Sequence, residues 1–421
     1  MEFRHVRGMR DLVSEDAERA RRVEVAVVDG IRSYGYEEVR LPLLEGSELF
    51  SRGVGEATDI VEKEMYTFLD RGGKQLSLRP EGTASCVRAG IERGLFHGRS
   101  QRLWYAGPMF RYERPQKGRF RQFDQVGAEV FGVAGPEAEA ELVQMVWSIW
   151  GGLGIADGIA LEINTVGAGR SRQAFRDALV AFLAPQADAL DADSRRRLDT
   201  NPLRILDSKV PSTRALLDDA PQLHDFLDDA DRAHFDGLRR LLDELRMPYR
   251  VNPRLVRGLD YYTHTVFEWV TDGVGAQDAV CAGGRYDGLV ERLGGRPTPA
   301  VGFAIGVDRV VLLASETQGD IDYRPVDAYW VVLDRRFMGR VLDMAQRLRE
   351  SVPGLRVRTD TAGGKPAAQF RRADESGARW ALIVGEDEVA REQVSVKWLR
   401  EEREQVMLPF EEVGAALRAG C

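Results

Sequence analysis

Apolar residues recur with two different periods in the first 150 residues of the chain. Residues 15–33 place them at helical spacing, which predicts an amphipathic helix. Thr83 is in position to cap a further helix that runs through Arg93, and another helix is expected from about Pro136 to Gly151. Extended segments or strands, separated by turns that contain glycine, are predicted at 35–45, 64–70, 73–80 and 101–113 and in the return arm of a hairpin within 109–131.

Helical spacing also dominates a later region, residues 170–248, which is rich in Asp, Arg and Leu. We interpret it as a helical insertion, because strand-like patterns precede it and resume after it. The resumed pattern covers 252–270 and 279–290 and ends in 299–316, a strand that leads into a helix. One apolar face of the insertion is predicted to carry Phe235, Leu238, Leu241, Leu242 and Leu245.

The C-terminal part of the chain has a different pattern of predicted elements. Residues 317–325 have the composition of a linker, and strands alternate with helices beyond them. This alternation predicts a small α/β domain of about a hundred residues. Its predicted strands are 327–334, 355–360 and 379–385, and its predicted helices are 337–351 and 366–377.

The composition narrows the class of protein. A chain of 421 residues is too long for one ordinary core, so two to three domains are expected. The charged N-terminus is unlike a secretory signal, and no stretch approaches the roughly 20 apolar residues of a membrane span. Cys86, Cys281 and Cys421 are too scattered to indicate a disulfide framework or a zinc site. We therefore expect a soluble cytoplasmic protein without a structural metal.

Positive charge is concentrated in one short segment of an acidic chain. The net charge is −8 and the pI about 5.5, which argues against a dedicated, non-specific nucleic-acid binder. Yet five of the eleven positions from Arg111 to Arg121 are cationic, whereas average composition would give about 1.5. The excess persists although the chain is rich in arginine throughout.

The hairpin that carries this segment separates polar from apolar side chains. Because side chains alternate between the faces of a strand, Arg111 and Glu113 share one face of the first arm. Gln125, Gly127 and Glu129 share the polar face of the return arm, where a glycine permits close approach of another molecule. A solvated outer face is the plain alternative. An anionic ligand site is favoured over it, because aromatic rings are interleaved with the cations of the connecting loop.

Three other clusters are each open to two interpretations. Glu81 precedes a helix start. A carboxylate at this position could either bind a ligand or interact favourably with the helix dipole. Arg257 and Asp260 precede two tyrosines, and a surface ion pair beside core tyrosines is slightly favoured over a site. Arg309 lies in the first turn of a helix, where anions bind but an exposed arginine is equally ordinary. None of these clusters decides the function alone.

Taken in order, these segments resemble the class II aminoacyl-tRNA synthetases, and specifically the histidyl-tRNA synthetase family. The resemblance covers nearly the whole chain and implies an α+β fold. That fold is an antiparallel sheet flanked by helices, with a helical insertion and a C-terminal α/β anticodon-binding domain. The absence of a P-loop or dinucleotide fingerprint agrees with it. Segments 33–45, 110–132 and 300–313 look like motifs 1, 2 and 3 of the class, and 255–269 and 279–295 match two histidine-specific signatures.

The resemblance implies an enzyme, a histidine–tRNA ligase. It would activate L-histidine with ATP to histidyl-adenylate and transfer the histidyl group to the 3′ end of tRNA-His. Mg²⁺ is expected with the nucleotide, without a dedicated protein site, and a homodimer is implied by motif 1. The implied domains are a catalytic domain at 1–322, with the insertion at 170–248 inside it, and the anticodon-binding domain at 326–421.

Residues that match the family motifs carry the implied roles. Arg111 would hold the α-phosphate, and Arg257 would take the place of a catalytic magnesium in other class II enzymes. The implied ATP-binding residues are Arg111, Glu113, Arg119, Phe123 and Arg309. The implied histidine-binding residues are Glu81, Thr83, Arg111, Gln125, Glu129, Arg257, Tyr261, Tyr262 and Tyr286. The implied contacts of the tRNA acceptor end are Arg114 and Gln116.

Two positions depart from the family pattern, and three alternatives remain. Asp124 stands where relatives have His, and Asp308 stands where Glu is common. The nearest alternative is the non-catalytic regulatory subunit of ATP phosphoribosyltransferase, which lacks the anticodon-binding domain. The others are a sensor of uncharged tRNA, which would carry additional domains, and a related threonyl, prolyl or glycyl synthetase.

Overall fold

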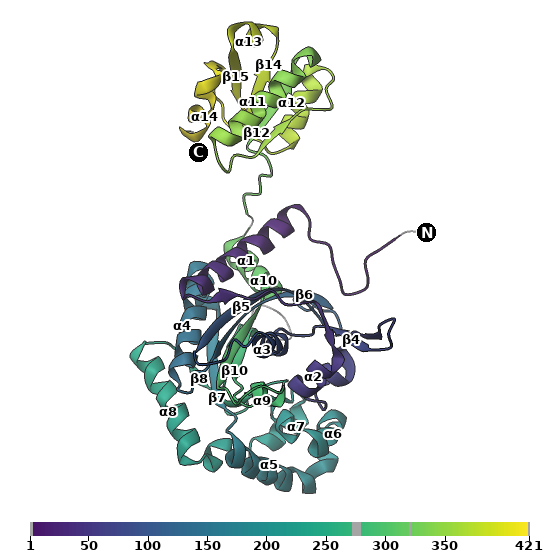
Figure 1. Cartoon of the computed structure of the whole chain (residues 1–421), viewed down its shortest axis with the longest axis vertical. Coiled ribbons are helices and arrows are strands. Elements are labelled where there is room, and N and C mark those ends of the chain that lie inside the picture. Colours follow the sequence, from purple (N-terminus) through teal and green to yellow (C-terminus); the bar gives the residue numbers. More distant parts are fainter. Residues whose placement is uncertain (1–2, 272–278, 320, 420–421) are drawn as a thin grey trace. The chain divides into compact units, whose positions relative to one another are not determined.

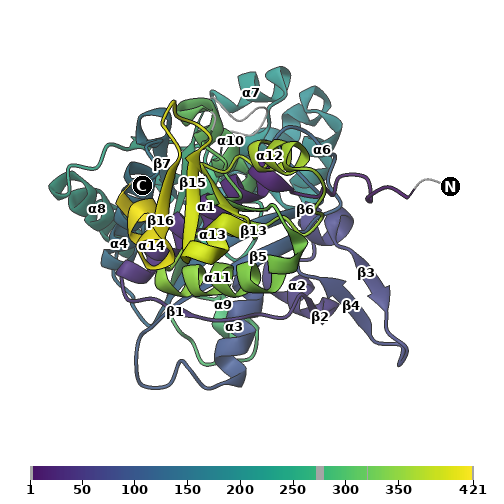
Figure 2. The ribbon, with the colours of Figure 1, turned by 90° about the horizontal axis from the view of Figure 1, so that it is seen from above.

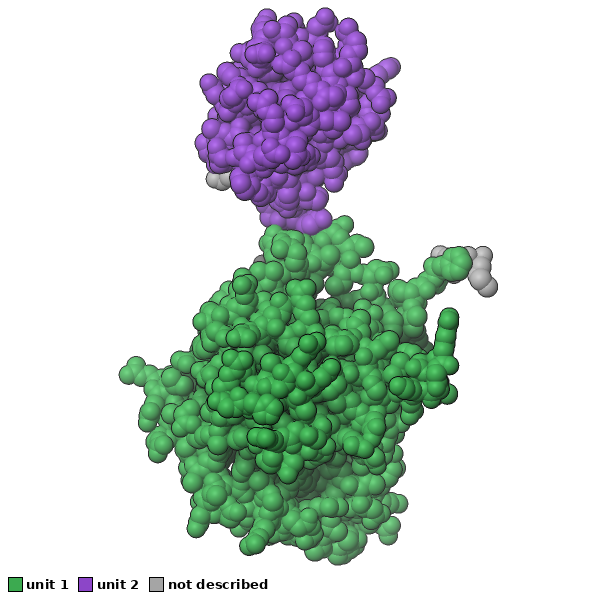
Figure 3. Space-filling view, in the orientation of Figure 1, with its two compact units in different colours: residues 1–320 green, residues 321–421 purple. Residues whose placement is uncertain are grey.

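The computed structural model describes residues 3–271, 279–319 and 321–419, so Cys421 lies outside the described residues. The chain forms two compact units, residues 1–320 and 321–421, which are coloured separately in Figure 3. Each unit has hydrophobic cores of its own.

An eight-stranded sheet forms the centre of the first unit. Its strands are β1 (Glu37–Glu38), β5 (Gln101–Phe110), β6 (Gln122–Phe131), β7 (Ala160–Thr165), β8 (Arg250–Val251), β9 (Thr263–Val270), β10 (Ala279–Arg285) and β11 (Ala300–Gly306). They are hydrogen-bonded in the order β1-β5-β6-β11-β10-β9-β7-β8. The six central strands are antiparallel, as expected. The edge pairs β1/β5 and β7/β8 are parallel, so the sheet as a whole is mixed.

Helices cover one face of this sheet and enclose the main core (Figures 1 and 2). Three of them are α1 (Ser14–Ser33), α4 (Glu137–Gly152) and α10 (Val307–Gln318). The helical spacing that predicted α1 is visible in its packing, because Val23, Val27 and Ile31 are its buried residues. From the sheet, Val126 and Ala128 of β6 point into the same core.

Shorter elements lie on the opposite face of the sheet. They are α2 (Ser47–Val54), α3 (Thr83–Glu92), α9 (Leu289–Arg292) and a three-stranded sheet of β2 (Leu44–Gly46), β4 (Gln75–Leu78) and β3 (Thr67–Leu69). A second core joins α3 and α9 to this face through residues such as Val87, Leu289 and Tyr105. Side chains of β5 and β6 that do not enter the main core therefore face these elements.

The predicted helical region is helical in the structure. It contains α5 (Gly169–Leu183), α6 (Ala192–Thr200), α7 (Pro211–Leu217) and α8 (Asp229–Glu244), with short 3₁₀ turns between them. The segments before α8 enclose a small core of their own. In contrast, α8 packs Phe235, Leu238 and Leu242 into the main core of the sheet. Leu245 was expected on that face but is 40% exposed; it directly follows Glu244, the last residue of α8.

The second unit is an α/β domain, as the alternating pattern predicted. Its strands are β12 (Ala328–Val332), β13 (Val357–Thr359), β14 (Trp380–Val384), β15 (Gln393–Trp398) and β16 (Val406–Pro409). They are ordered β13-β12-β14-β15-β16, with β12 parallel to both of its neighbours. The helices are α11 (Met338–Ser351), α12 (Pro366–Glu375), α13 (Glu386–Arg391) and α14 (Phe410–Ala419).

The described residues contain neither a candidate membrane span nor a candidate metal cluster. None of their helices combines the length and apolar character that crossing a membrane requires. No group of three or more His, Cys, Asp or Glu side chains among them is arranged to hold a metal ion.

Candidate active site

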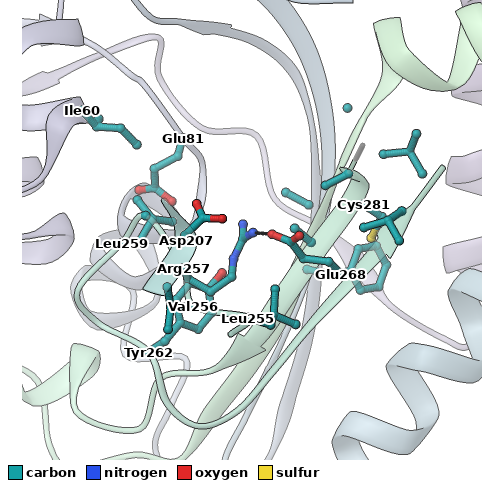
Figure 4. Close-up of a pocket in the computed structure, with 18 of the residues that line it drawn as sticks. Ile60, Glu81, Asp207, Leu255, Val256, Arg257, Leu259, Tyr262, Glu268 and Cys281 are labelled. Atoms are coloured by element: carbon teal, nitrogen blue, oxygen red, sulfur yellow. Dashed lines mark hydrogen bonds and ion pairs between the residues drawn. The ribbon is translucent and has the colours of Figure 1, made fainter. Parts of the chain in front are cut away.

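A cavity of about 750 Å³ opens on the sheet face opposite the main core. Its walls come from the start of α3, the 111–121 loop between β5 and β6, strands β9 to β11, the first turn of α10 and the insertion. The exposed Arg114 and Gln116 are not among its lining residues. Figure 4 shows part of the cavity. The predicted residues that line it are Glu81, Thr83, Arg111, Glu113, Arg119, Phe123, Gln125, Arg257, Tyr261, Tyr262, Tyr286 and Arg309.

Glu129 lies directly behind the cavity wall and is 1% exposed. Its Oε1 accepts hydrogen bonds from the hydroxyls of Thr83 at 2.7 Å and Tyr105 at 3.0 Å. The Tyr286 hydroxyl donates to Oε2. Burial raises the pKa of Glu129 to about 8, and the three hydroxyl donors only partly oppose this rise. The carboxyl therefore keeps its proton at pH values at which an exposed glutamate has lost it.

Tyr105 is a residue of this site that the sequence analysis missed. It lies on β5 directly opposite Gly127 on β6, and its ring occupies the place where a side chain at Gly127 would be. The prediction that Gly127 admits an external molecule is therefore wrong, because the close approach comes from the protein's own tyrosine. The hairpin register, which pairs an aromatic residue with a glycine, was the signal that could have identified it.

Glu81 caps the start of α3. Its carboxylate accepts the backbone N–H groups of Thr83 at 2.7 Å and Ala84 at 2.9 Å. The predicted capping role of Thr83 is wrong, because Thr83 is the first helical residue and its hydroxyl is directed to Glu129. Burial raises the pKa of Glu81, against the effect of these two backbone donors. Glu81 also lines the cavity, so its role at the helix start is confirmed and its role toward a ligand stays a prediction.

The polar face of β6 leaves one acceptor open to the cavity. Within the described residues, the buried Oε1 of Gln125 has no hydrogen-bond partner. Buried polar atoms are nearly always paired, so an unpaired one in a cavity wall indicates a ligand donor. The rings of Tyr261 and Tyr262 lie 4.7 Å apart and those of Tyr261 and Tyr286 lie 5.5 Å apart, which closes this end of the cavity with aromatic surface.

Four arginines line the same cavity: Arg111, Arg119, Arg257 and Arg309. Burial lowers the pKa of Arg111 and of Arg119. Burial lowers the pKa of Arg309 to about 10, and repulsion from the other three arginines adds to the fall. Cations that repel one another in a partly desolvated cleft are stabilised by a bound polyanion.

Neighbouring groups hold each arginine in place. Arg111 donates from Nε to the Pro80 carbonyl at 2.8 Å, and Arg309 donates to the Ala279 carbonyl at 2.5 Å. Arg119 forms an ion pair with Glu113. These contacts leave the guanidinium groups at defined positions around the cavity.

Arg257 forms an ion pair with Glu268 of β9, which Figure 4 marks with a dashed line. Asp260, its predicted surface partner, instead accepts a hydrogen bond from Asn201 at 2.6 Å. The interpretation of Arg257 and Asp260 as a surface ion pair is therefore wrong. Glu268 was not among the predicted residues, although a lone carboxylate between Phe267 and Trp269 was a visible signal.

The fold and the site together define a class II aminoacyl-tRNA synthetase, and sequence comparison narrows this class. Residues 8–310 match the family described as "Histidyl-tRNA synthetase", and residues 326–420 match the family described as "Anticodon binding domain". The chain therefore belongs to the histidyl-tRNA synthetase family, whose members are ATP-dependent ligases. The second match favours the ligase over the regulatory subunit of ATP phosphoribosyltransferase.

Solved structures agree with this assignment. The apo histidyl-tRNA synthetase of S. aureus is 33% identical, with a TM-score of 0.81 over 99% of this chain and 100% of that chain. A histidyl-tRNA synthetase from a Nostoc species shares the fold at 21% identity, with a TM-score of 0.72 over 100% of both chains. A Bacillus halodurans protein titled as an ATP phosphoribosyltransferase regulatory subunit/histidyl-tRNA synthetase shares it at 19% identity, with a TM-score of 0.65 over 91% of this chain and 98% of that chain.

Proposed function

We propose that the chain joins histidine to tRNA-His in two steps inside this cavity. In the first step, a carboxylate oxygen of histidine attacks the α-phosphorus of ATP, and the bond to the β-phosphate oxygen breaks to release pyrophosphate. In the second step, a hydroxyl of the terminal ribose of the tRNA attacks the histidyl carbonyl carbon and releases AMP. One observation carries the proposal: the four arginines line a cavity whose wall includes Thr83, Tyr105 and Tyr286, the three donors to the buried Glu129 carboxyl behind it.

The amino acid would be held at both ends. Glu129 and Tyr262 would engage the imidazole nitrogens, because a carboxyl with a pKa of about 8 can either accept from or donate to a ring nitrogen. Glu81, Thr83 and the open acceptor of Gln125 would bind the ammonium group. A site that leaves buried partners unpaired when the wrong amino acid enters can discriminate by about 10⁴–10⁵. The remaining wall would be aromatic, from Tyr261 and Tyr286.

Arg111 and Arg257 would act at the reacting phosphorus. Each is held by a fixed partner, the Pro80 carbonyl for Arg111 and Glu268 for Arg257. Preorganised cations stabilise the charge that develops in the transition state without reorganising during the reaction. Arg111 would hold the α-phosphate against the attacking carboxylate, and Arg257 would supply a permanent positive charge on its other side.

The rest of the nucleotide would lie between the loop and α10. Arg119 and Arg309 would bind the outer phosphates, and adenine would stack on Phe123 beside Glu113. In the structure Arg119 is paired with Glu113. We propose that ATP takes this arginine for its phosphates and thereby frees the Glu113 carboxylate for the adenine amino group.

Mg²⁺ would arrive with the nucleotide. Glu113 and Glu268, two of the carboxylates that line the cavity, are paired with arginines, and the described residues contain no group of three or more His, Cys, Asp or Glu side chains arranged to hold a metal ion. No step is assigned to the metal. Phosphate oxygens are hard ligands that suit Mg²⁺.

The remaining partners follow from the family. Arg114 and Gln116 would touch the tRNA acceptor end, and the 326–421 domain would read the anticodon, in a cytoplasmic enzyme. We propose a homodimer through the motif 1 region. Four large apolar side chains exposed there and on the adjacent small sheet support it: Leu43, Leu44, Phe68 and Leu69.

Amino-acid-dependent ATP–pyrophosphate exchange, measured with each of the twenty amino acids, tests the proposal. Histidine should support exchange well above the other nineteen. Exchange that no amino acid stimulates would refute the proposal and favour the regulatory subunit, and exchange with threonine, proline or glycine would favour a related synthetase.

A further inference from the structure

The segment before α1 lies against the loop between β5 and β6. The Gly8 carbonyl accepts the backbone N–H of Arg121 at 2.7 Å, and the Arg7 carbonyl accepts from the Arg121 guanidinium at 3.4 Å. Gly8 has a φ of +86°, and a Cβ there would lie 2.8 Å from the Arg121 side chain and 2.9 Å from that of Pro115. The backbone angle and the close approach both require glycine, so the segment fits the loop closely.

Arg10 connects this segment to two further elements. Its guanidinium lies 3.9 Å from the centre of the Phe120 ring and pairs with Asp308 in the first turn of α10. The other oxygen of Asp308 accepts the backbone N–H of Asp124 on β6 at 3.0 Å. One guanidinium thus joins the loop to the start of α10 and, through Asp308, to β6.

The two partners of Arg10 are the sequence neighbours of two cavity arginines. Phe120 follows Arg119, and Asp308 precedes Arg309. We propose that Arg10 is a positioning residue, which fastens the loop to α10 and so holds Arg119 and Arg309 at the spacing that the outer phosphates of ATP require. This inference rests on the proposed function and adds to it a residue outside the motifs.

The charges around Arg10 agree with this role. Burial and the neighbouring carboxylates of Asp308 and Glu24 raise the pKa of Asp124 to about 6, whereas Arg10 and Arg79 oppose the rise. Arg10 therefore places a positive charge beside two carboxylates, Asp124 and Asp308, that repel each other. A half-buried arginine that also lies over an aromatic face is held more firmly than an exposed one.

Steady-state pyrophosphate exchange with the full chain tests the proposal through Arg10→Ala. At saturating histidine, the KM for ATP should rise about tenfold with kcat little changed, as the loss of nucleotide positioning predicts. The dissociation constant for histidine, measured by calorimetry, should not change. Arg10→Lys should lie between the wild type and Arg10→Ala, because lysine keeps the charge and loses the planar contact.

Two further variants sharpen the test. Arg7→Ala is the matched control, because it removes a cation from the same segment while its contact with the loop uses the backbone carbonyl. It should leave the KM for ATP unchanged. Asp308→Asn should raise that KM, and the double variant with Arg10→Ala should be no worse than the worse single variant, because the two residues act as one pair.

Three results would overturn the proposal: an unchanged KM for ATP in Arg10→Ala, the same increase in Arg7→Ala, or a parallel loss of histidine affinity. A wild type without histidine-dependent exchange would instead refute the proposed function. The Arg10 proposal would then be decided by calorimetric binding of a non-hydrolysable ATP analogue. An unchanged affinity in Arg10→Ala would overturn it, and a weakened affinity would support it.

Discussion

Replacing Glu129 by glutamine should separate the stability of the catalytic unit from its recognition of histidine. Burial raises the pKa of Glu129 from 4.5 to about 8. Between these two values the folded protein keeps a proton that the unfolded chain has lost, so the free energy of unfolding falls as the pH rises through this window. From pH 5 to pH 8 the fall is on the order of 3 kcal/mol, from roughly 1.4 kcal/mol per pKa unit.

The glutamine variant should lack this fall, because its amide does not titrate in this range. The amide oxygen can still accept from Thr83 and Tyr105, and the amide nitrogen can donate to the Tyr286 oxygen. We therefore expect the variant and the wild type to be similarly stable at pH 5 and the variant to be more stable at pH 8. Histidine should bind it about ten- to a hundredfold more weakly, since a charge-assisted hydrogen bond is lost.

Urea unfolding of both proteins at pH 5 and pH 8, followed by tryptophan fluorescence, measures the stability difference. Histidine calorimetry and the KM for ATP measure recognition. Glu139→Gln is a matched control, because the pKa of Glu139 is shifted in the opposite direction from that of Glu129. Glu139 is also fully buried, but hydrogen bonds from His234 and Arg285 outweigh its burial and lower its pKa, so this variant should be less stable at neutral pH.

The reasoning is refuted if Glu129→Gln changes stability equally at both pH values, because Glu129 would then titrate normally. Equal losses of histidine and ATP affinity would contradict the imidazole role.

Two other variants test separate parts of the site. Arg257→His should bind histidine normally but lose about 10²–10³-fold in exchange kcat, since a fixed transition-state cation is removed; near-normal exchange would show that Arg257 is not needed at the reacting phosphorus. Gly302→Ala should destabilise the catalytic unit by about 1–3 kcal/mol, because the new methyl group would collide with the Glu129 carboxylate and the Ala128 carbonyl. A thermal melt unchanged from the wild type would contradict this packing.

Local patterns predicted most of the elements, and the resemblance to the family motifs supplied the site residues. Helical spacing identified α1 and the helices from α5 to α8, and alternation assigned Val126 and Glu129 to opposite faces of the hairpin. The family motifs named twelve residues that line one cavity, although these come from the start of α3, the hairpin, the segment before β9, the end of β10 and the first turn of α10.

Features that depend on contacts between distant segments could not be predicted in this way. The parallel edge strands β1 and β8 contain two residues each, too few to show a period. Tyr105 enters the site only through its register opposite Gly127. The pairing of Arg257 with Glu268, and of Arg10 with Asp308 across 298 positions, is decided by how the elements pack. Sequence spacing does not carry that information.

The most direct test of the central claim is the charging of tRNA-His by the purified chain with labelled histidine and ATP. We predict histidyl-tRNA that accumulates with catalytic turnover and depends on ATP, and no charging of other tRNAs. Stable binding of histidine without any charged tRNA would contradict the assignment as a histidine–tRNA ligase.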